Sequence, residues 1–343
     1  MTASPLARLL DARPLRTADV RATFDRLIDP STTDVERAAL LVAVQARSLS
    51  VEEIVAFARC LRDRAVPFPT PRDDRPIDLC GSGGAPRPSF NVSTVSAFVV
   101  AAAGVPVLKH GNRSARGICG SSDLLEALGL PVTRSRPFAR AAYRKHSLAF
   151  LHAPLFHPVT AVVGPARRAL GVPTIFNRLG PLANPAAVPF QVAGAYDAAT
   201  AEMFSRGLAR LGVRRGMSMW STDGCDEFSP QALTHVVRWD GRRFRSGTVR
   251  PGDFLAADDR RGDWGALAPT HAAAETERIL AGGGGARRGS VLLTSGAALW
   301  IAGAARSLAE GVRRAEEALD AGGAAERLAG LRTLAARFPE ARS

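Results

Sequence analysis

Two loops near the middle of the chain carry residue types that suit a phosphate ligand. The first, Gly81-Ser82-Gly83-Gly84, directly follows the apolar run of residues 77–80, which we interpret as a strand. Glycines at a strand end leave backbone N–H groups open to an anion, because no Cβ stands in the way. Asn91-Val92-Ser93-Thr94 follows and can cap a helix whose N-terminus also favours negative charge. We predict a phosphate-binding turn here, although Gly-rich turns are common and no complete nucleotide fingerprint is present.

The second loop, Lys109-His110-Gly111-Asn112-Arg113, follows another expected strand and places an ammonium, an amide and a guanidinium close together. Such a cluster suits a diphosphate and a carboxylate. Lysine occurs elsewhere only at Lys145, so the choice of Lys109 indicates that a compact cation is needed at this position. The competing interpretation is a solvated loop leading into the capped helix that begins after Gly120-Ser121-Ser122-Asp123. Two such loops after neighbouring strands favour an anion site.

A third loop, Asp223-Gly224-Cys225-Asp226-Glu227, brings two adjacent carboxylates to the end of a further expected strand. Adjacent carboxylates can hold Mg²⁺ together with several waters, and Mg²⁺ commonly bridges to a pyrophosphate group. A plain acidic turn is the alternative and would be preferred if the glycine-rich loops were absent. With those loops present, the sequence predicts a magnesium site.

The elements that must position these loops fall into two parts. The first 65 residues read as short amphipathic helices, with capping-box spacing at Thr33-x-x-Glu36 and Ser50-x-x-Glu53. A proline-rich stretch at 67–76 cannot continue a helix and reads as a linker. We therefore predict a small helical domain at the N-terminus.

Short apolar runs then alternate with helical segments, the pattern of an α/β domain with a mostly parallel central sheet. Asp240-Gly241 is a plausible hairpin turn between residues 234–239 and 243–249. The C-terminal stretch 291–338 reads as helices broken at Gly322-Gly323 that close over the sheet. The expected strands are 77–80, 105–109, 148–151, 191–195 and 217–220, and the expected helices are 93–103, 122–128, 137–146, 159–170 and 198–211.

Composition excludes several classes of protein. A chain of 343 residues with 46% hydrophobic and 22% charged residues can bury a large core, which excludes disordered and fibrous classes. Its 45 basic and 32 acidic residues give a net charge of +13, which fits an anionic substrate or a nucleic acid. Because nearly all the cations are arginines and no nucleic-acid-binding motif accompanies them, we favour a general arginine bias over a nucleic-acid surface. Four scattered cysteines, no signal-peptide core and no membrane-length apolar run predict a cytoplasmic protein.

Taken together, the motifs resemble those of a known family. The chain resembles the anthranilate phosphoribosyltransferases, within the wider nucleoside phosphorylase and phosphoribosyltransferase fold, in the order and spacing of GSGG, N-x-S-T, KHGNR, GSSDLLEALG, RRALG-x-x-TIFN-x-LGPLANP and G-x-DE. The resemblance implies a homodimer of chains with a helical domain at 1–70, a contribution to it from about 165–185, and an α/β domain at 71–343. It also implies Mg²⁺-dependent transfer of phosphoribose from phosphoribosyl pyrophosphate (PRPP) to anthranilate, with release of pyrophosphate, between the two domains.

The resemblance also assigns roles to particular residues. It implies that Lys109 faces the pyrophosphate, and that Asn112 and Arg167, with Gly81, contact anthranilate. Of the six histidines, His110 is the one we expect to line the site. The resemblance implies a donor site made of Gly81, Gly83, Gly84, Asn91, Ser93, Thr94 and Lys109, and a set of magnesium ligands made of Ser93, Asp226 and Glu227.

The chain departs from the family pattern at four places. Ala85 stands where an Asp is expected, Arg116-Gly117 replaces a Ser-Ser pair, and Ser221 stands where a His is common. The segment 157–161 lacks the family's lysine. The first two changes make the donor pocket more positive, which leaves open either a different way of holding the diphosphate or a different donor or acceptor. The alternatives are a diverged paralogue that uses another aromatic acceptor or a nucleoside, and an inactive homologue that binds nucleic acid.

Overall fold

A seven-stranded sheet forms the centre of the larger part of the molecule, in the order β3-β2-β1-β4-β5-β6-β7. The computed structural model describes residues 4–338 except 12, 72 and 115–117. The first five strands run parallel, and β6 and β7 add an antiparallel hairpin at one edge. The strands are β1 (Ile77–Cys80), β2 (Val107–Gly111), β3 (Leu148–His152), β4 (Phe190–Gly194), β5 (Arg215–Ser221), β6 (Thr234–Trp239) and β7 (Phe244–Val249).

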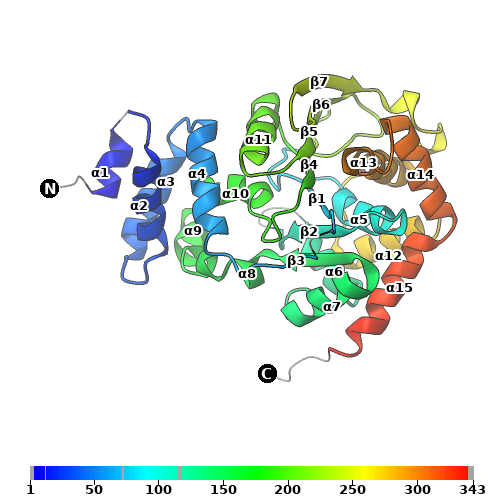
Figure 1. Ribbon diagram of the computed structural model, residues 1–343, viewed down its shortest axis with the longest axis horizontal. Helices are drawn as coiled ribbons and strands as arrows, with labels where there is room; N and C mark the ends of the chain where they lie inside the picture. Colours follow the sequence, from blue (N-terminus) through cyan, green and yellow to red (C-terminus); the bar gives the residue numbers. More distant parts are fainter. Residues whose placement is uncertain (1–3, 12, 72, 115–117, 339–343) are drawn as a thin grey trace.

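Helices cover both faces of this sheet (Figure 1). Alternate residues of β4 belong to different cores, because Val192 packs with α5 and α13 whereas Ala193 packs with α11 and the N-terminal helices. The α-helices are α1 (Pro5–Leu10), α2 (Thr17–Ile28), α3 (Asp34–Gln45), α4 (Val51–Arg62), α5 (Val92–Ala102), α6 (Ser121–Ala127), α7 (Arg136–His146), α8 (Ala153–Phe156), α9 (Gly164–Leu170), α10 (Ile175–Leu179), α11 (Ala198–Arg210), α12 (Pro269–Leu280), α13 (Ala286–Ala302), α14 (Leu308–Asp320) and α15 (Gly323–Ala335). Four 3₁₀ helices, η1 (Pro158–Ala161), η2 (Gly180–Leu182), η3 (Pro251–Asp253) and η4 (Asp258–Arg260), complete the described elements.

The predicted α/β organisation and N-terminal helices are confirmed. The predicted strands match β1 to β5 within two residues at each end, and the hairpin turns at Asp240-Gly241 as expected. The β2 boundary matters, because Lys109, His110 and Gly111 lie inside the strand, paired with β3, and not in a loop after it. The Lys109 side chain therefore projects from a strand and not from a loop.

One helix prediction is wrong. Residues 159–170 form η1 and the separate helix α9, and not one helix, because Gly164-Pro165 interrupts the chain and Pro165 starts α9 at its first turn. At the C-terminus, the predicted break at Gly322 is confirmed, and a second break that we did not predict lies at Gly303. Gly303 adopts φ +84°, a left-handed conformation that ends α13.

The two predicted capping boxes have different outcomes. At Ser50 the box is complete, since the Ser50 hydroxyl accepts from Glu53 N–H and the Glu53 carboxylate accepts from Ser50 N–H. At Thr33 only the hydroxyl forms its bond, to Glu36 N–H at 3.2 Å. The Glu36 carboxylate is taken instead by the guanidinium of Arg26 on α2, at 2.6 Å and 2.8 Å. A tertiary ion pair thus outcompetes the local cap.

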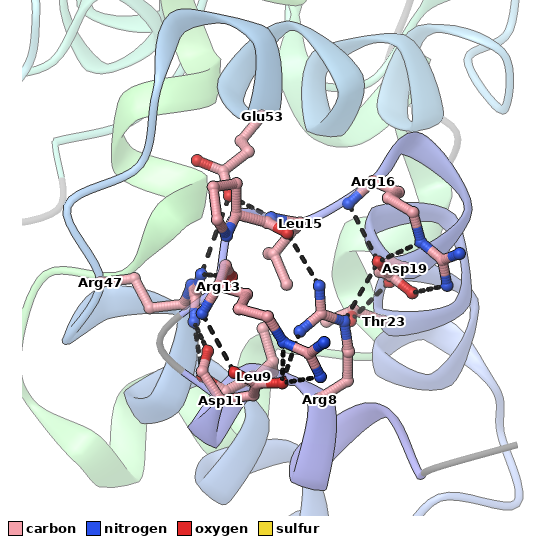
Figure 2. A network of polar contacts seen from close by, with 11 residues as sticks. Arg8, Leu9, Asp11, Arg13, Leu15, Arg16, Asp19, Thr23, Arg47 and Glu53 are labelled. Carbon is pink, nitrogen blue, oxygen red and sulfur yellow. Dashed lines mark hydrogen bonds and ion pairs between the residues drawn. The ribbon is translucent and has the colours of Figure 1, made fainter.

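Polar contacts fix the segment between α1 and α2 onto α4 and the loop that precedes it (Figure 2). The Glu53 carboxylate accepts from the backbone N–H of Leu15 at 2.8 Å, in addition to its bond to Ser50. The guanidinium of Arg47 donates at 2.5 to 2.8 Å to the carbonyls of Leu9, Asp11 and Arg13. These bonds satisfy backbone groups of a segment that has no regular partner.

Two separate groups of helices, which we call the helical bundle, contribute apolar residues to one core. Apolar residues of α9, α10 and η2 share one core with those of α2, α3 and α4, including Phe176, Leu179 and Phe24. Arg62 at the end of α4 donates from its guanidinium to the carbonyl of Leu182 in η2 at 2.6 Å and to that of Leu211, just after α11, at 3.1 Å. Burial lowers the pKa of Arg62 to about 10. Within the described residues, none of the helices is both long enough and apolar enough to cross a bilayer.

Candidate active site

Four segments meet at the C-terminal edge of the parallel strands. They are the glycine turn after β1, the end of β2, the first turn of α5 and the acidic loop after β5. The carboxyl edge of a parallel sheet is where ligands bind in open α/β folds, because the loops that follow neighbouring strands converge there. β1 lies between β2 and β4 in the sheet, which puts the glycine turn at the centre of this edge.

The Asp226 carboxylate is held by the glycine turn. Its Oδ2 accepts from Ser82 N–H at 2.6 Å, from the Ser82 hydroxyl at 2.7 Å and from Gly83 N–H at 3.3 Å. A Cβ at Gly81 would lie 2.9 Å from Asp226 Oδ2 and 3.5 Å from Glu227 Oε1, so any other residue would push the Asp226 carboxylate out of its place. Gly194 at the end of β4 is more restricted, since its Cβ would lie 1.8 Å from the Asp226 carbonyl oxygen. Close backbone approach, therefore, brings the two loops together.

Glu227 follows Asp226 and is also buried, at 4% exposed. Its Oε1 accepts from Ser93 N–H in the first turn of α5 at 3.3 Å, while its Oε2 is buried without a hydrogen-bond partner. Burial, together with the neighbouring Asp226 charge, raises the pKa of Glu227 to about 8, and the Lys109 cation opposes this rise. A buried, unpartnered carboxylate oxygen of this kind calls for a cation or a proton.

Lys109 reaches the same place from β2. Its ammonium is buried and donates to the Leu79 carbonyl at 2.5 Å and to the Ser93 hydroxyl at 3.1 Å. Below it, Asp78 of β1 accepts from His110 N–H at 3.1 Å, and burial raises the pKa of Asp78 to about 6. Ser93 is therefore the link between the cation and Glu227.

The donor set fits the predicted magnesium ion. Asp226 and Glu227 are adjacent buried carboxylates, one Glu227 oxygen has no partner, and Ser93 contacts Glu227 through its backbone N–H. The described residues contain no cluster of three or more His, Cys, Asp or Glu side chains that could hold a metal, so the set here is an incomplete one of two carboxylates. Magnesium suits such an incomplete set, because it keeps several waters and takes one or two carboxylates together with substrate phosphates.

Not every predicted site residue joins this cluster. Gly84 lies next to it, beside Tyr196, and Thr94 is buried in the first turn of α5. The amide of Asn91 donates to the Cys119 carbonyl at 3.0 Å, which ties the α5 cap to the loop after β2. Asn112 is exposed on that loop.

Arg167 lies apart, on α9 of the helical bundle. Its guanidinium donates to the Asn177 side chain at 3.4 Å and lies 5.4 Å from the centre of the Phe176 ring. Burial lowers the pKa of Arg167. The contacts of the described residues do not connect Arg167 to the carboxylate cluster. Arg116 and Gly117, which replace the family's Ser-Ser pair, lie outside the described residues.

The histidines take structural positions. His110 is buried, with Nδ1 3.3 Å from the Gly180 carbonyl, and its ring lies 5.2 Å from that of His157. Burial, followed by the neighbouring His157, lowers the pKa of His110 to about 3. His157 Nε2 lies 2.8 Å from the Ala183 carbonyl. His110 is therefore neutral at physiological pH and can serve only as a hydrogen-bonding group.

Sequence reasoning missed two groups that hold the acidic loop. The Ser221 hydroxyl donates to the Glu227 carbonyl at 2.6 Å and lies 2.7 Å from the Thr234 hydroxyl. Arg87, behind the glycine turn, pairs with Asp223 at 3.4 Å, and its guanidinium lies 5.5 Å from the centre of the Trp264 ring. In the sequence, the one signal for Ser221 is its position before the acidic pair, where the family commonly has a His.

Comparison with known proteins agrees with this architecture. The profile described as "Glycosyl transferase family, a/b domain" matches residues 73–325, and "Glycosyl transferase family, helical bundle domain" matches residues 4–65. The fold and site thus define a glycosyltransferase of the two-part type, with a helical bundle and an α/β sheet.

Individual relatives narrow this class. The anthranilate phosphoribosyltransferase of Methylobacterium radiotolerans is 41% identical over 331 residues, covering 95% of this chain and 94% of its own. That of Moorella thermoacetica is 37% identical, with 96% of each chain covered. The chain belongs to the anthranilate phosphoribosyltransferase family, as its motifs indicated.

Solved structures show the same fold. The anthranilate phosphoribosyltransferase of Thermus thermophilus superposes with a TM-score of 0.88 at 32% identity, covering 97% of this chain and 100% of that one. The Saccharomyces cerevisiae enzyme in complex with PRPP and Mg superposes with a TM-score of 0.86 at 23% identity, covering 97% of each chain. The predicted fold class, a small helical part and a larger α/β part with a mostly parallel sheet, is confirmed.

Proposed function

We propose that this protein transfers the phosphoribosyl group of PRPP to the amino group of anthranilate, releasing pyrophosphate, in a magnesium-dependent reaction. The name shared by its full-length relatives supports this activity. The observation that carries the proposal is the contact of the glycine turn with Asp226, beside a buried Glu227 oxygen that has no partner. This arrangement places a candidate divalent-cation site directly against the glycine turn.

In the proposed donor site, the diphosphate lies against the glycine turn and the N-terminus of α5. Lys109, already fixed by Ser93 and the Leu79 carbonyl, supplies a positive charge on a rigid strand. The full donor set is Gly81, Gly83, Gly84, Asn91, Ser93, Thr94 and Lys109. Ser93, Asp226 and Glu227 would hold Mg²⁺, which neutralises the departing diphosphate when it is bound.

The reaction needs little acid-base help from the chain. The amino group of anthranilate is already nucleophilic, so holding it close to C1 of the ribose and stabilising the leaving diphosphate supply most of the rate. We propose that Arg167 pairs with the anthranilate carboxylate, with Asn112 and Gly81 at the same acceptor. The single 3.4 Å bond of Arg167 to Asn177 and the Phe176 ring beside its guanidinium suit a flat aromatic acid.

The departures from the family pattern bear on donor affinity. Ala85 leaves the loop without its expected carboxylate, yet the same loop is tied to the acidic loop through Arg87 and Asp223. The backbone adds a second tie, from Arg87 N–H to the Gly224 carbonyl at 3.3 Å. We propose that these ties hold the glycine turn in a binding geometry in place of the missing Asp.

Calorimetric titration with PRPP and Mg²⁺ tests the donor site. We expect binding by the wild-type protein, and loss of that binding in Asp226→Ala/Glu227→Ala or after magnesium is chelated. Asp253→Ala/Asp258→Ala is the matched control, because both carboxylates are exposed on η3 and η4. Absence of PRPP binding by the wild-type protein would overturn the proposal.

Loss of anthranilate fluorescence tests the acceptor. With PRPP and Mg²⁺ present, we expect anthranilate to be consumed at a rate that falls strongly in Arg167→Ala. Because Arg167 lies outside the donor cluster, PRPP binding is expected to persist in this variant. Donor binding without any consumption of anthranilate would instead identify a paralogue that uses another acceptor.

We also propose that the protein is a homodimer that associates through its helical bundle. Leu10, Val35 and Val42 are apolar yet 73%, 82% and 48% exposed, and all three lie on α1 and α3. Light scattering is expected to give twice the chain mass, and a monomer for Val35→Glu/Val42→Glu. A monomeric wild-type protein would contradict this assembly.

A further inference from the structure

A hollow lies at the opposite edge of the sheet from the candidate active site. It has a volume of about 730 Å³ and lies where β4 and β5 begin, next to the turn of the β6–β7 hairpin and the end of α13. Figure 1 shows this hairpin beyond β5, with α11 on one side and α13 on the other. The acidic loop follows the other end of β5, about 20 Å away at the usual rise per strand residue. The two sites are therefore separate.

The hollow is lined by arginines that lack carboxylate partners. Of its five lining arginines, only Arg215 has a fixed role, since its guanidinium donates to the Trp300 carbonyl at 3.0 Å. Within the described part of the chain, the other four form no ion pair; they are Arg75, Arg214, Arg242 and Arg243. Unpaired guanidinium groups around a concave surface attract anions, since each presents several N–H donors in a fixed plane.

Among the described residues that line the hollow, Asp240 is the one acidic side chain, and its carboxylate is engaged by its own turn. Its Oδ1 accepts from the backbone N–H groups of Arg242 and Arg243, each at 3.0 Å. These bonds hold the pKa of Asp240 below its usual value. The carboxylate thus shapes the turn and leaves both arginine side chains available.

An aromatic surface adjoins the arginines. Phe190 and Trp239 line the hollow and are buried, and Phe244, which also lines it, is 40% exposed. The Phe244 ring lies 6.3 Å from that of Trp239 at 28°, with the Arg206 guanidinium 5.2 Å from the Phe244 ring centre. An exposed ring beside guanidinium groups can stack on a planar ligand group.

We propose that this hollow binds a small organic phosphate with a planar ring, of the mononucleotide class. The volume lies within the usual range for small-molecule sites, and the arginines suit a dianionic phosphate. The exposed Phe244 side chain provides an aromatic surface for the planar ring of the ligand. A polymeric nucleic acid would instead need an extended basic groove that follows its backbone.

Calorimetric titration with AMP tests the site, with adenosine and inorganic phosphate as its separate parts. We expect AMP to bind the wild-type protein more tightly than either part, both with and without PRPP and Mg²⁺ present. Arg242→Glu/Arg243→Glu is expected to weaken AMP binding at least tenfold. Both side chains are exposed on a turn, so the fold should be retained, which circular dichroism checks.

Arg136→Glu/Arg140→Glu on α7 is the matched control, because it makes the same charge change on an exposed surface elsewhere. It should leave AMP binding unchanged, and Phe244→Ala should weaken the binding of AMP but not of phosphate. Equal losses in both double variants, or AMP binding no better than phosphate, would overturn the proposal. So would tighter, steeply salt-dependent binding of a single-stranded oligonucleotide, which would identify a nucleic-acid surface.

Discussion

Replacing Gly194 by alanine is expected to separate the two loops of the candidate active site. The added Cβ would lie 1.8 Å from the Asp226 carbonyl oxygen, 2.9 Å from its carbon and 3.2 Å from Gly81 Cα. All three are backbone atoms, so no side chain can rotate away. Reaching even 3.0 Å requires the Asp226 backbone to move by about 1.2 Å, which would stretch the bonds from its carboxylate to Ser82 well beyond hydrogen-bond range.

The cost has two parts. Overpacking against backbone costs about 1–3 kcal/mol, and weakening hydrogen bonds to a buried carboxylate costs about 1.5–3 kcal/mol each. Since the chain can relax in part, we expect Gly194→Ala to lower the free energy of unfolding by about 3–5 kcal/mol. PRPP affinity in the presence of Mg²⁺ should fall at least tenfold, because the carboxylate pair is displaced from the glycine turn.

Urea denaturation and calorimetric titration together measure these effects. Gly180→Ala is the control, because Gly180 has helical backbone angles and open space around its Cβ position. We expect that variant to change stability by less than about 1 kcal/mol, on the stabilising side. A Gly194→Ala protein with wild-type unfolding and PRPP affinity would refute the argument that backbone contact positions the acidic loop.

Three further changes probe the same region. Arg87→Ala should raise the KM for PRPP several-fold with little change in kcat, because Arg87 ties the glycine loop to Asp223; steady-state kinetics with an unchanged KM would contradict this. Ser221→Ala should lower the free energy of unfolding by about 2 kcal/mol, because it removes a hydroxyl that bonds the Glu227 carbonyl; a loss below about 0.5 kcal/mol in urea denaturation would argue against it. His110 binds a proton near pH 6.5 when unfolded but only near pH 3 when folded, so acid favours the unfolded chain. The stability lost between pH 7 and pH 5 should therefore be smaller by about 2 kcal/mol in His110→Asn than in the wild type, and identical losses in the two proteins would mean that His110 does not contribute.

The parallel strands could be predicted because their sequences are governed by burial alone. Residues 77–80 and 148–152 are buried on both faces of the sheet. In the sequence they form short, mostly apolar runs with turn-forming residues at their ends. The convergence of the glycine turn and the acidic loop could likewise be inferred, because loops after parallel strands share one edge. The order of apolar runs and helical segments along the chain was therefore enough to predict both the parallel strands and the edge at which their loops meet.

Other features depend on contacts that no local pattern encodes. The Glu36 carboxylate leaves its expected cap for Arg26, and Ser82 binds a carboxylate 144 residues away. The role of Ser221 arises from antiparallel pairing with Thr234, which brings two hydroxyls together. The glycine needed at Gly194 depends on how closely two loops pack and not on its own segment. Sequence patterns within one segment cannot predict which of several distant partners a side chain will bond.

The shared core of the helical bundle bears on how this protein could be recombined. We propose that residues of about 165–185 belong with the 1–70 helical domain, because Ile175, Phe176 and Leu179 pack among the N-terminal helices. A chimaera that imported only the first 65 residues from a relative would join unmatched halves of one interior, and Arg62 would need the same carbonyl partners in its new host. A successful graft must therefore transplant both stretches of chain at once.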